Sequence, residues 1–396
     1  MRGRTVVRMD VLESRRLMSA AYPTAMEQFV IERLNQARAN PTAEAARYGI
    51  ALNEGLPAGT ISTAPKQTLA VSPYLTDSAR KHSQWMLATD TFSHTGVNGS
   101  HPNDRMAAAG YTFAGTWKWG ENIAWQGTTG TLDVKSSVDT MIKNYFVDAG
   151  IPDRGHRVNM MDGGFKEVGG GIATGTMKQY NAAALTEDFA ASGSGSFLTG
   201  VAYTDAIKRD HFYTVGEGLG GITVTAKRLS DGATFKTATW SAGGYSLKLY
   251  AGTYAVTASG TSLHGTVSAG NVTVGSQNVK KDFIPIAAAA TGSVAGNVFK
   301  DLNANGRKDA GEGNLASWKV FVDANRNGVL DTGEKTAITD TYGNYKLTGL
   351  AAGSYRIRIV TPWNWRRTSP AWGYPELKLA AGQAFTGYNF GELRIA

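Results

Sequence analysis

The chain has 396 residues, of which 42% are hydrophobic and 18% charged, so it is long and apolar enough for several globular domains rather than a disordered chain. It contains no cysteine, which excludes disulfides, thiolate metal sites and a cysteine nucleophile but leaves export open. No apolar run reaches the roughly 18–20 residues of a membrane span, which excludes an integral membrane protein. The net charge of +8 includes only one short basic and aromatic stretch, Trp363–Arg367, so nucleic-acid binding is not expected.

The N-terminal segment 1–22 is set apart from the rest. Residues 1–20 carry five basic and two acidic side chains and lack the apolar core of an ordinary signal peptide. Leu12–Ala20 resembles a short motif near the start of large exported bacterial surface proteins, with Ser14 where that motif has proline. The alternative is a disordered basic start. The resemblance makes residues 1–22 an export-associated segment, and in both cases we expect them to lie outside the fold.

Residues 24–205 are predicted to form a first domain of helices and strands. Apolar side chains recur at helical spacing in three stretches, and the first stretch ends at Asn40 before a proline. These stretches are 26–37, 75–86 and 134–146. Two short strands bounded by glycine follow at Val168–Thr174 and Phe197–Thr204. Helices first and a small sheet late favour an α+β domain over regular βαβ units.

Two of the six histidines lie in glycine-flanked turns of this domain, on either side of a carboxylate motif. His94 is in FSHTG, Glu121 in GENIAW and His156 in RGHR. Neutral imidazole and carboxylate oxygen suit zinc or another divalent metal, so these residues are a candidate joint site. His82 lies on an apolar helical stripe and is expected to be a core or capping histidine. No role is assigned to His101, His211 or His264.

The motifs of this domain resemble the CAP superfamily (cysteine-rich secretory, antigen 5 and pathogenesis-related proteins) in its bacterial cysteine-free form. The matching pieces come in the family's order: IERLNQARANP, DSARKHSQWML, FSHTG, HPNDRMAAAGY, GENIAW, IPDRGHRVNMM and VGGGIATG. The resemblance covers roughly residues 26–205. It implies an α-β-α sandwich, in which a central antiparallel sheet lies between two helical layers, with an open cleft.

In that family two histidines and two acids line the cleft and can hold a divalent metal. The resemblance implies His94, Glu121 and His156 for three of them. The second acid matches loosely, with Asp148 as the first choice and Asp139 as the second. A three-ligand site would leave positions open for water or substrate. The alternative is that Glu121 ties the cleft loops together through backbone N–H groups.

Nothing in the sequence of this domain specifies a catalyst. The motifs HExxH and GxSxG do not occur, and no serine–histidine–acid set can be assigned. The family resemblance implies binding of lipids, sterols or envelope components more often than turnover. Binding is therefore favoured over catalysis.

From residue 206 the sequence changes to alternating β-branched and aromatic runs typical of strands. TWSAGGYSLKLYAGTYAV recurs about 100 residues later as TDTYGNYKLTGLAAGSYRI, which indicates two copies of one module. We expect two all-β, prealbumin- or immunoglobulin-like sandwiches at 206–287 and 291–396. They resemble the B-repeat and carboxypeptidase-regulatory-like modules of bacterial surface proteins.

Two stretches of the second module, 301–312 and 323–334, both fit DxNxNGxxDxxE. Calcium takes six to eight oxygen ligands, which this spacing supplies, and glycine at the sixth position allows the sharp turn. The expected ligands are Asp301, Asn303, Asn305, Arg307 (carbonyl), Asp309 and Glu312 in loop 1, and Asp323, Asn325, Asn327, Val329 (carbonyl), Asp331 and Glu334 in loop 2. No helices are expected beside these loops, which resemble the calcium loops of B-repeat modules. A related stretch, 205–217, lacks the glycine, carries an extra residue and is not predicted to bind.

Together these features predict a secreted or cell-surface, monomeric bacterial protein. Its CAP domain is expected to bind an extracellular or envelope ligand (a lipid, a glycan or a protein), and β modules stiffened by calcium are expected to display it. Zinc is the candidate ion for the cleft. The alternative is a secreted metal-dependent hydrolase, peptidase-like or nuclease-like, with the modules as spacers. In a third interpretation the β modules are themselves the adhesin.

Overall fold

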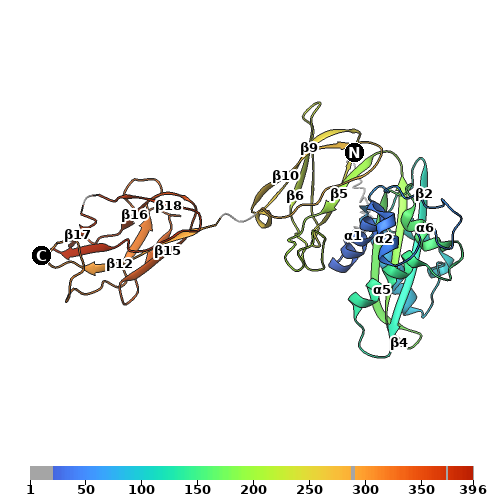
Figure 1. The fold of residues 1–396 in the computed structure, drawn as a ribbon, viewed down its shortest axis with the longest axis horizontal. Coiled ribbons are helices and arrows are strands. Elements are labelled where there is room, and N and C mark those ends of the chain that lie inside the picture. The colour runs from blue at the N-terminus through green and yellow to red at the C-terminus, as the bar shows by residue number, and fades with distance from the viewer. Residues whose placement is uncertain (1–20, 287–289, 372, 396) are drawn as a thin grey trace, which may run out of the picture. The chain divides into compact units, whose positions relative to one another are not determined.

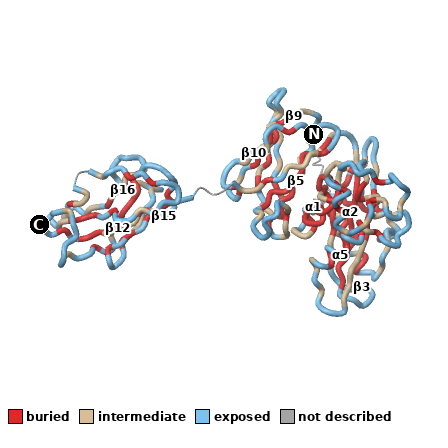
Figure 2. Tube along the Cα trace, viewed as in Figure 1, coloured by how far each residue is buried: buried red, intermediate tan, exposed pale blue. Residues whose placement is uncertain are grey.

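The computed structural model describes residues 21–286, 290–371 and 373–395, and all but two residues of the N-terminal segment 1–22 lie outside them. The chain divides after Ile286 into two compact units, called unit 1 and unit 2 below. Figure 1 shows the strands and helices of the two units, and each unit has its own buried core (Figure 2). None of the helices in the described ranges is long and apolar enough to cross a membrane.

The first part of unit 1 is built on a four-stranded sheet in the order β1-β3-β4-β2. Three long strands run antiparallel, and the two-residue β1 pairs in parallel with β3 at one edge. The strands are β1 (Ala70–Val71), β2 (Trp117–Thr128), β3 (Glu167–Met177) and β4 (Tyr180–Ser192). The register of β2 on β4 places Glu121 opposite Asp188.

Helices cover both faces of this sheet (Figure 1), which confirms the predicted α-β-α sandwich. One face packs against α1, α5 and α6, and the other against α3 and α4. The helices are α1 (Ala25–Ala39), α2 (Pro41–Arg47), α3 (Pro73–Ala88), α4 (Pro102–Ala108), α5 (Val134–Val147) and α6 (Gly155–Met161), with short 3-10 turns η1 (Val97–Gly99) and η2 (Pro152–Arg154).

Local sequence accounts for the start of α1 and for the closeness of α3 to the sheet. Thr24 and Glu27 form a capping box: the N–H of Glu27 donates to Thr24 Oγ1 at 3.3 Å, and the N–H of Thr24 donates to Glu27 Oε2 at 2.8 Å. On β3, a Cβ added to Gly169 would lie 2.1 Å from backbone atoms of α3, and one added to Gly171 would lie 2.0 Å away. The predicted glycine-rich strand is therefore the place where a helix backbone lies directly on the sheet.

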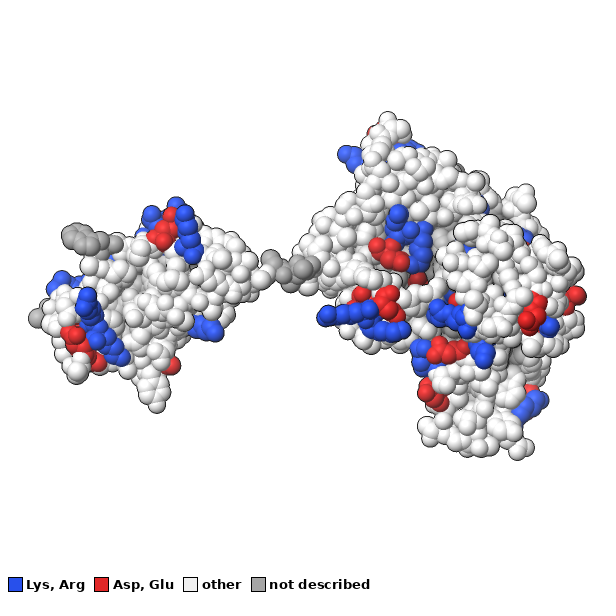
Figure 3. Space-filling model, in the orientation of Figure 1, with Lys and Arg blue, Asp and Glu red and all other residues white. Residues whose placement is uncertain are grey.

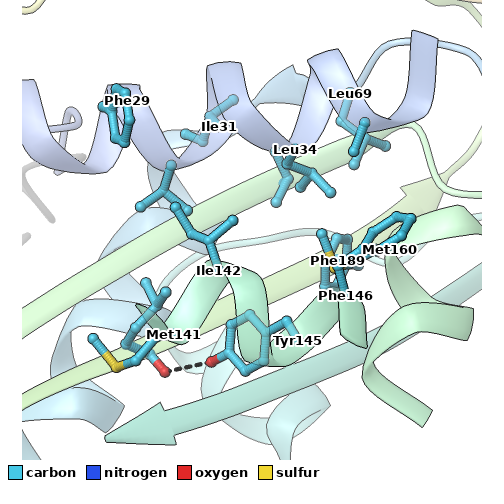
Figure 4. Packing of buried hydrophobic residues seen from close by; sticks show 14 of the residues in the cluster. Phe29, Ile31, Leu34, Leu69, Met141, Ile142, Tyr145, Phe146, Met160 and Phe189 are labelled. Carbon is cyan, nitrogen blue, oxygen red and sulfur yellow. Dashed lines mark hydrogen bonds between the residues drawn. The ribbon is translucent and has the colours of Figure 1, made fainter. Parts of the chain in front are cut away.

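The largest core lies between α1, α5 and the sheet (Figure 4). Leu34 of α1 and Ile142 of α5 are almost fully buried there. Tyr145 of α5 is buried too, and its hydroxyl donates to the carbonyl oxygen of Leu185 on β4 at 2.7 Å. These contacts fix α5, whose C-terminal end carries part of the candidate site.

The second part of unit 1 is a β-sandwich with sheets in the orders β10-β9-β6-β7 and β11-β5-β8. Its elements are β5 (Ser196–Val201), β6 (Thr223–Arg228), β7 (Thr234–Ala238), β8 (Gly244–Leu249), β9 (Gly252–Gly260), η3 (Thr261–Leu263), β10 (Gly265–Val274) and β11 (Val279–Lys280). The apolar sides of its strands form a separate core.

Strand β5 corrects the sequence analysis, which assigned a strand at Phe197–Thr204 to the sheet of the first domain. β5 pairs antiparallel with β8 and in parallel with β11, so the first sandwich begins at Ser196 and not after residue 205. The turn after β4 explains the difference. Gly193 and Gly195 have φ of 64° and 100°, and this left-handed backbone turns the chain out of the first sheet.

Unit 2 is a second sandwich of similar layout. One sheet has the order β14-β13-β16-β18, and the other has the order β15-β12-β20-β17, with β19 beside β12. The strands are β12 (Gly292–Lys300), β13 (Lys319–Val322), β14 (Thr336–Ile338), β15 (Asn344–Leu350), β16 (Gly353–Ile359), β17 (Trp365–Ser369), β18 (Glu376–Leu379), β19 (Ala384–Phe385) and β20 (Phe390–Arg394).

The two sandwiches repeat the same buried polar contacts. The hydroxyl of Thr239 donates to the carbonyl of Leu219, and that of Thr339 donates to the carbonyl of Leu315. The hydroxyls of Tyr245 and Tyr345 each donate across their sandwich, to the carbonyls of Lys281 and Tyr388 at 2.6 and 2.5 Å. The sequence repeat is thus a repeat of internal architecture.

Buried polar contacts join the helical part of unit 1 to its sandwich. The side-chain amide of Asn278 donates to the carbonyl oxygens of Thr68 at 3.0 Å and Lys166 at 2.6 Å, and its oxygen accepts from the N–H of Phe197 at 2.8 Å. Lys280 places Nζ 2.9 Å from Glu32 Oε2 on α1. These bonds cross between the two parts, so we expect unit 1 to unfold as one body.

The substitution Asn278→Ala should lower the free energy of unfolding of unit 1 by about 2–3 kcal/mol, because it leaves the carbonyl of Thr68 and the N–H of Phe197 without their partner. Asn271→Ala, at an exposed position of β10, should change it by less than about 0.5 kcal/mol. Thermal unfolding followed by circular dichroism measures both. If the sandwich of Asn278→Ala unfolded at a lower temperature while the helical part kept its melting temperature, unit 1 would not unfold as one body.

Candidate functional site

Glu121 is the centre of the first pair of predicted site residues. It lies on β2 and is 6% exposed. His94 Nδ1 lies 2.7 Å from its Oε1, and Arg105 of α4 donates to its Oε2. Arg105 also donates to the carbonyl oxygens of His94 and Ser100, both at 2.9 Å. Glu121 therefore ties the His94 loop to the sheet, and its donors are side chains rather than the backbone N–H groups of the alternative interpretation.

Asp148 and His156 form a second pair. Asp148 follows α5 in the left-handed conformation, with φ of 53°, and is buried. Its Oδ1 lies 2.7 Å from His156 Nδ1, and its Oδ2 accepts from the backbone N–H groups of His156 at 2.9 Å and Arg157 at 3.3 Å. Asp139, the second choice for this acid, instead pairs with Lys135 at 2.5 Å.

In both pairs Nδ1 faces a carboxylate, which leaves Nε2 of each imidazole to meet an ion or a ligand. The carboxylate oxygens are engaged by N–H donors. Over residues 21–286, 290–371 and 373–395, no three His, Asp or Glu side chains are grouped to hold a metal ion. The four predicted residues thus form two His–carboxylate pairs rather than one ligand set, and zinc in the cleft stays a prediction.

A cleft of about 400 Å³ opens beside the second pair. This volume lies within the range typical of small-molecule sites, about 300–1,000 Å³. Apart from Asp148 and His156, the lining is mostly apolar, with Phe92, Trp125 and Ile151 among it. Phe92 is 47% exposed and Ile151 42%, so large apolar side chains are open to solvent at this cleft. The arrangement suits a ligand with an apolar body and a polar end.

A larger hollow of about 620 Å³ lies between α1, α5 and the residues that follow β5. Its lining is largely charged, and Figure 3 shows lysine, arginine and acidic side chains side by side over unit 1. Several of these charges pair with one another, as Lys208 does with Asp210 at 2.8 Å. The smaller, mostly apolar cleft beside Asp148 and His156 is therefore the better candidate for a ligand-binding site.

The sequence analysis missed three buried polar residues next to the site. Asn122 Nδ2 donates to the carbonyl of His156 at 3.3 Å and to Glu187 Oε2 at 3.1 Å. Burial raises the pKa of Glu187 to about 7, and burial together with nearby Glu121 raises the pKa of Asp188. The run AAALTEDFAA held a signal, because two acids inside a continuous apolar strand must be buried or paired.

His82 is a core histidine, as predicted. It lies on α3, is 1% exposed, stacks on Trp85 and shares a hydrogen bond of 3.0 Å between its Nε2 and the carbonyl of Ser93. Burial lowers its pKa to about 4, although nearby Glu121 opposes the shift. The imidazole is therefore neutral in the folded protein at neutral pH.

This lowered pKa makes unit 1 sensitive to acid. Between pH 6.5 and 4 the unfolded chain protonates His82 and the folded chain does not, so the stabilising contribution of His82 is present above pH 6.5 and is lost as the pH falls towards 4. The stability advantage of the wild type over His82→Gln should shrink by about 2 kcal/mol across this range. The exposed His264→Gln is the control in urea titrations. A stability difference between the wild type and His82→Gln that did not change with pH would contradict this role of His82.

In loops 1 and 2 the carboxylates at positions 9 and 12 make the same hydrogen bonds. The position-12 glutamates each accept two backbone N–H groups: Glu312 from Leu302 at 2.7 Å and Asp309 at 2.9 Å, Glu334 from Ala324 at 2.8 Å and Asp331 at 3.0 Å. The position-9 aspartates each accept the side-chain amides of both loop asparagines at 2.6–2.9 Å. Positions 3, 5 and 9 therefore meet at one point in each loop, and their side chains carry oxygen atoms of the kind that calcium takes as ligands.

The loops differ at position 1. Asp301 is fully buried, and its two oxygens accept the N–H groups of Asn305 at 3.0 Å and Gly306 at 2.7 Å. Asp323 is buried as well, but its Oδ2 accepts from both Gly328 N–H at 3.1 Å and the guanidinium of Arg358. Its Oδ1 has no hydrogen-bond partner among the described residues.

The related stretch 205–217 has the same backbone frame without the asparagines. Glu217 accepts N–H groups of Ile207, Lys208 and Thr214 at 2.8–3.1 Å, as the position-12 glutamates do. Gly216 precedes it with φ of 98°, and Gly311 and Gly333 hold the same place with 91° and 92°. Here the charge of Lys208 pairs with Asp210 within the loop.

Two family models match the chain. Residues 31–189 match the Cysteine-rich secretory protein family (CAP), and residues 292–387 match the SdrD B-like domain. No curated protein matches the sequence.

Solved structures similar to the chain include a protein with an SCP domain and two pilins. An extracellular protein containing an SCP domain from Bacillus anthracis is 23% identical, over 31% of this chain and 34% of that one, with a TM-score of 0.22. The minor pilin GBS52 of Streptococcus agalactiae is 16% identical, over 50% of this chain and 96% of that one, with a TM-score of 0.27. The shaft pilin SpaA of Lactobacillus rhamnosus is 9% identical, over 51% and 99%, with a TM-score of 0.28.

Proposed function

The chain carries a CAP domain at 31–189 and an SdrD B-like domain at 292–387, and from this combination we propose that it is an exported protein of the cell surface. Unit 1 binds an extracellular or envelope ligand in its cleft, and calcium stiffens the sandwich of unit 2. The observation that carries the proposal is the His156–Asp148 pair set in an otherwise mostly apolar cleft of about 400 Å³.

The ligand of this cleft is an amphiphile, such as a lipid with a polar end group. Transfer of an apolar chain from water onto Phe92, Trp125 and Ile151 supplies the affinity, since each buried CH₂ contributes about 0.8 kcal/mol. The Nε2 of His156, oriented by Asp148, gives the polar end one hydrogen-bonding partner. A glycan would leave most of its hydroxyl groups without partners on this surface.

Binding of a dansyl-labelled fatty acid to the full chain, followed by fluorescence, tests the cleft. Phe92→Ser should weaken binding about tenfold, because it removes a large apolar contact, and His156→Ala should weaken it as well. Tyr250→Ser, at a site 66% exposed in the first sandwich, is the control.

Equal affinity of all three variants would refute the cleft as the binding site. Hydrolysis of peptide, lipid or nucleic acid by the wild type that disappears in His156→Ala would instead favour the hydrolase alternative.

The proposed calcium sites rest on the side-chain donors of loops 1 and 2. Each loop brings the position-9 aspartate together with two side-chain amides, and it carries two further carboxylates at positions 1 and 12. Like charges within one short loop repel when no cation is present. A calcium ion would take its oxygens from the residues predicted for each loop. Binding to the folded state alone stabilises a protein, by about 2.7 kcal/mol at a hundredfold excess over Kd.

Calorimetric titration of the full chain should show two calcium ions, bound in the range of about 10⁻⁴–10⁻³ M that is typical of extracellular modules. Glu312→Gln and Glu334→Gln should each remove one ion, since the twelfth position can supply two oxygens. Asp340→Asn, an acid of the same unit outside the loops whose amide oxygen can still accept the N–H groups of its turn, should leave both. Absence of binding in the wild type would refute the calcium proposal.

A further inference from the structure

Arg358 distinguishes the two proposed calcium loops of unit 2. It lies on β16, outside the loop motif, 35 residues from Asp323 in sequence. Its Nε donates to Asp323 Oδ2, and the side chains of the pair are 19% and 0% exposed. The guanidinium carbon also lies 4.3 Å from the ring centre of Tyr374, and this cation–π contact helps to hold the guanidinium in place.

The same guanidinium lies over the sharp turn of loop 2. A Cβ built on Gly328 would be 3.4 Å from Arg358 Nη1. At the equivalent Gly306 of loop 1, the nearest atoms belong to Thr368 and Ser369, about 3.8–4.0 Å away, and carry no charge. Among the described residues, no ion pair reaches the carboxylates of loop 1, whereas loop 2 has this one.

The position-1 aspartates of the two loops also differ in how their oxygens are paired. Oδ1 is buried and has no partner in the described part of the chain, so one ligand position of loop 2 stays free while Arg358 holds the other oxygen. In loop 1 both oxygens of Asp301 accept backbone N–H groups, and among the described residues no arginine or lysine pairs with this carboxylate. The position-1 carboxylate of loop 2, unlike that of loop 1, is therefore partly neutralised before any ion arrives.

We propose that Arg358 acts as a built-in cation that holds loop 2 closed without calcium and lowers the calcium affinity of this loop below that of loop 1. The inference rests on the proposed calcium binding. A fixed positive charge beside a divalent cation repels it, and the number of ligand charges sets the affinity of such loops. Loop 1 fills first as calcium rises, and loop 2 responds only at higher concentration.

The test is calorimetric titration of full-length Glu312→Gln, in which loop 2 is the remaining site of unit 2. Adding Arg358→Gln, whose amide can still donate to Asp323, should tighten the remaining site about tenfold. Adding Arg358→Lys, which keeps the charge, should leave the affinity near that of the parent. Arg366→Gln, an exposed arginine of β17, is the control for loss of charge and should have no effect.

Loop 1, measured in Glu334→Gln with and without Arg358→Gln, should keep its affinity and thereby report that unit 2 is folded. Unchanged or weaker binding to loop 2 in Arg358→Gln would overturn the inference, and so would a gain that Arg358→Lys shares. If the wild type binds one ion at loop 1 and loop 2 stays silent in every variant, the inference alone fails. If the wild type binds no calcium, the proposed function itself fails.

Discussion

Negative charge that is buried or crowded must be compensated, and this constraint organises both units. In unit 1, Glu121 is held by Arg105 and His94, and Asp148 by His156 and two backbone N–H groups. Where no cation is at hand, burial holds the proton instead, as the raised pKa of Glu187 indicates. The geometry of the cleft follows from these pairings, because each one fixes a loop or a helix end at its rim.

Residues 205–217, loop 1 and loop 2 share one backbone arrangement, but their carboxylates are compensated in different ways. In residues 205–217 a lysine of the loop pairs with Asp210. In loop 2 an arginine from a neighbouring strand takes one oxygen of Asp323, and in loop 1 only backbone N–H groups meet Asp301. Under the calcium binding proposed for loops 1 and 2, the C-terminal sandwich is the part that responds to calcium.

Local patterns carried most of what could be predicted from the sequence. The apolar spacing of α1, α3 and α5, the glycine-rich β3 and the loop motifs of unit 2 are each written within a few residues. Partners distant in sequence were not predictable: the sequence offers no sign that Arg105 meets Glu121 or that Arg358 meets Asp323, since the fold alone brings them together. The same holds for β5, whose sheet is decided by the turn at Gly193 and Gly195 and by a strand about 50 residues later.

Hydrogen exchange of backbone amides, with and without millimolar calcium, tests the central claim most directly. The account predicts that calcium slows exchange at Asn305, Gly306 and Leu302 of loop 1, and at the matching amides of loop 2 with a higher midpoint. The amides of Ile207, Lys208 and Thr214, which make the same bonds without the calcium ligands, should not change. Equal exchange in calcium and in chelator at loops 1 and 2 would contradict the account.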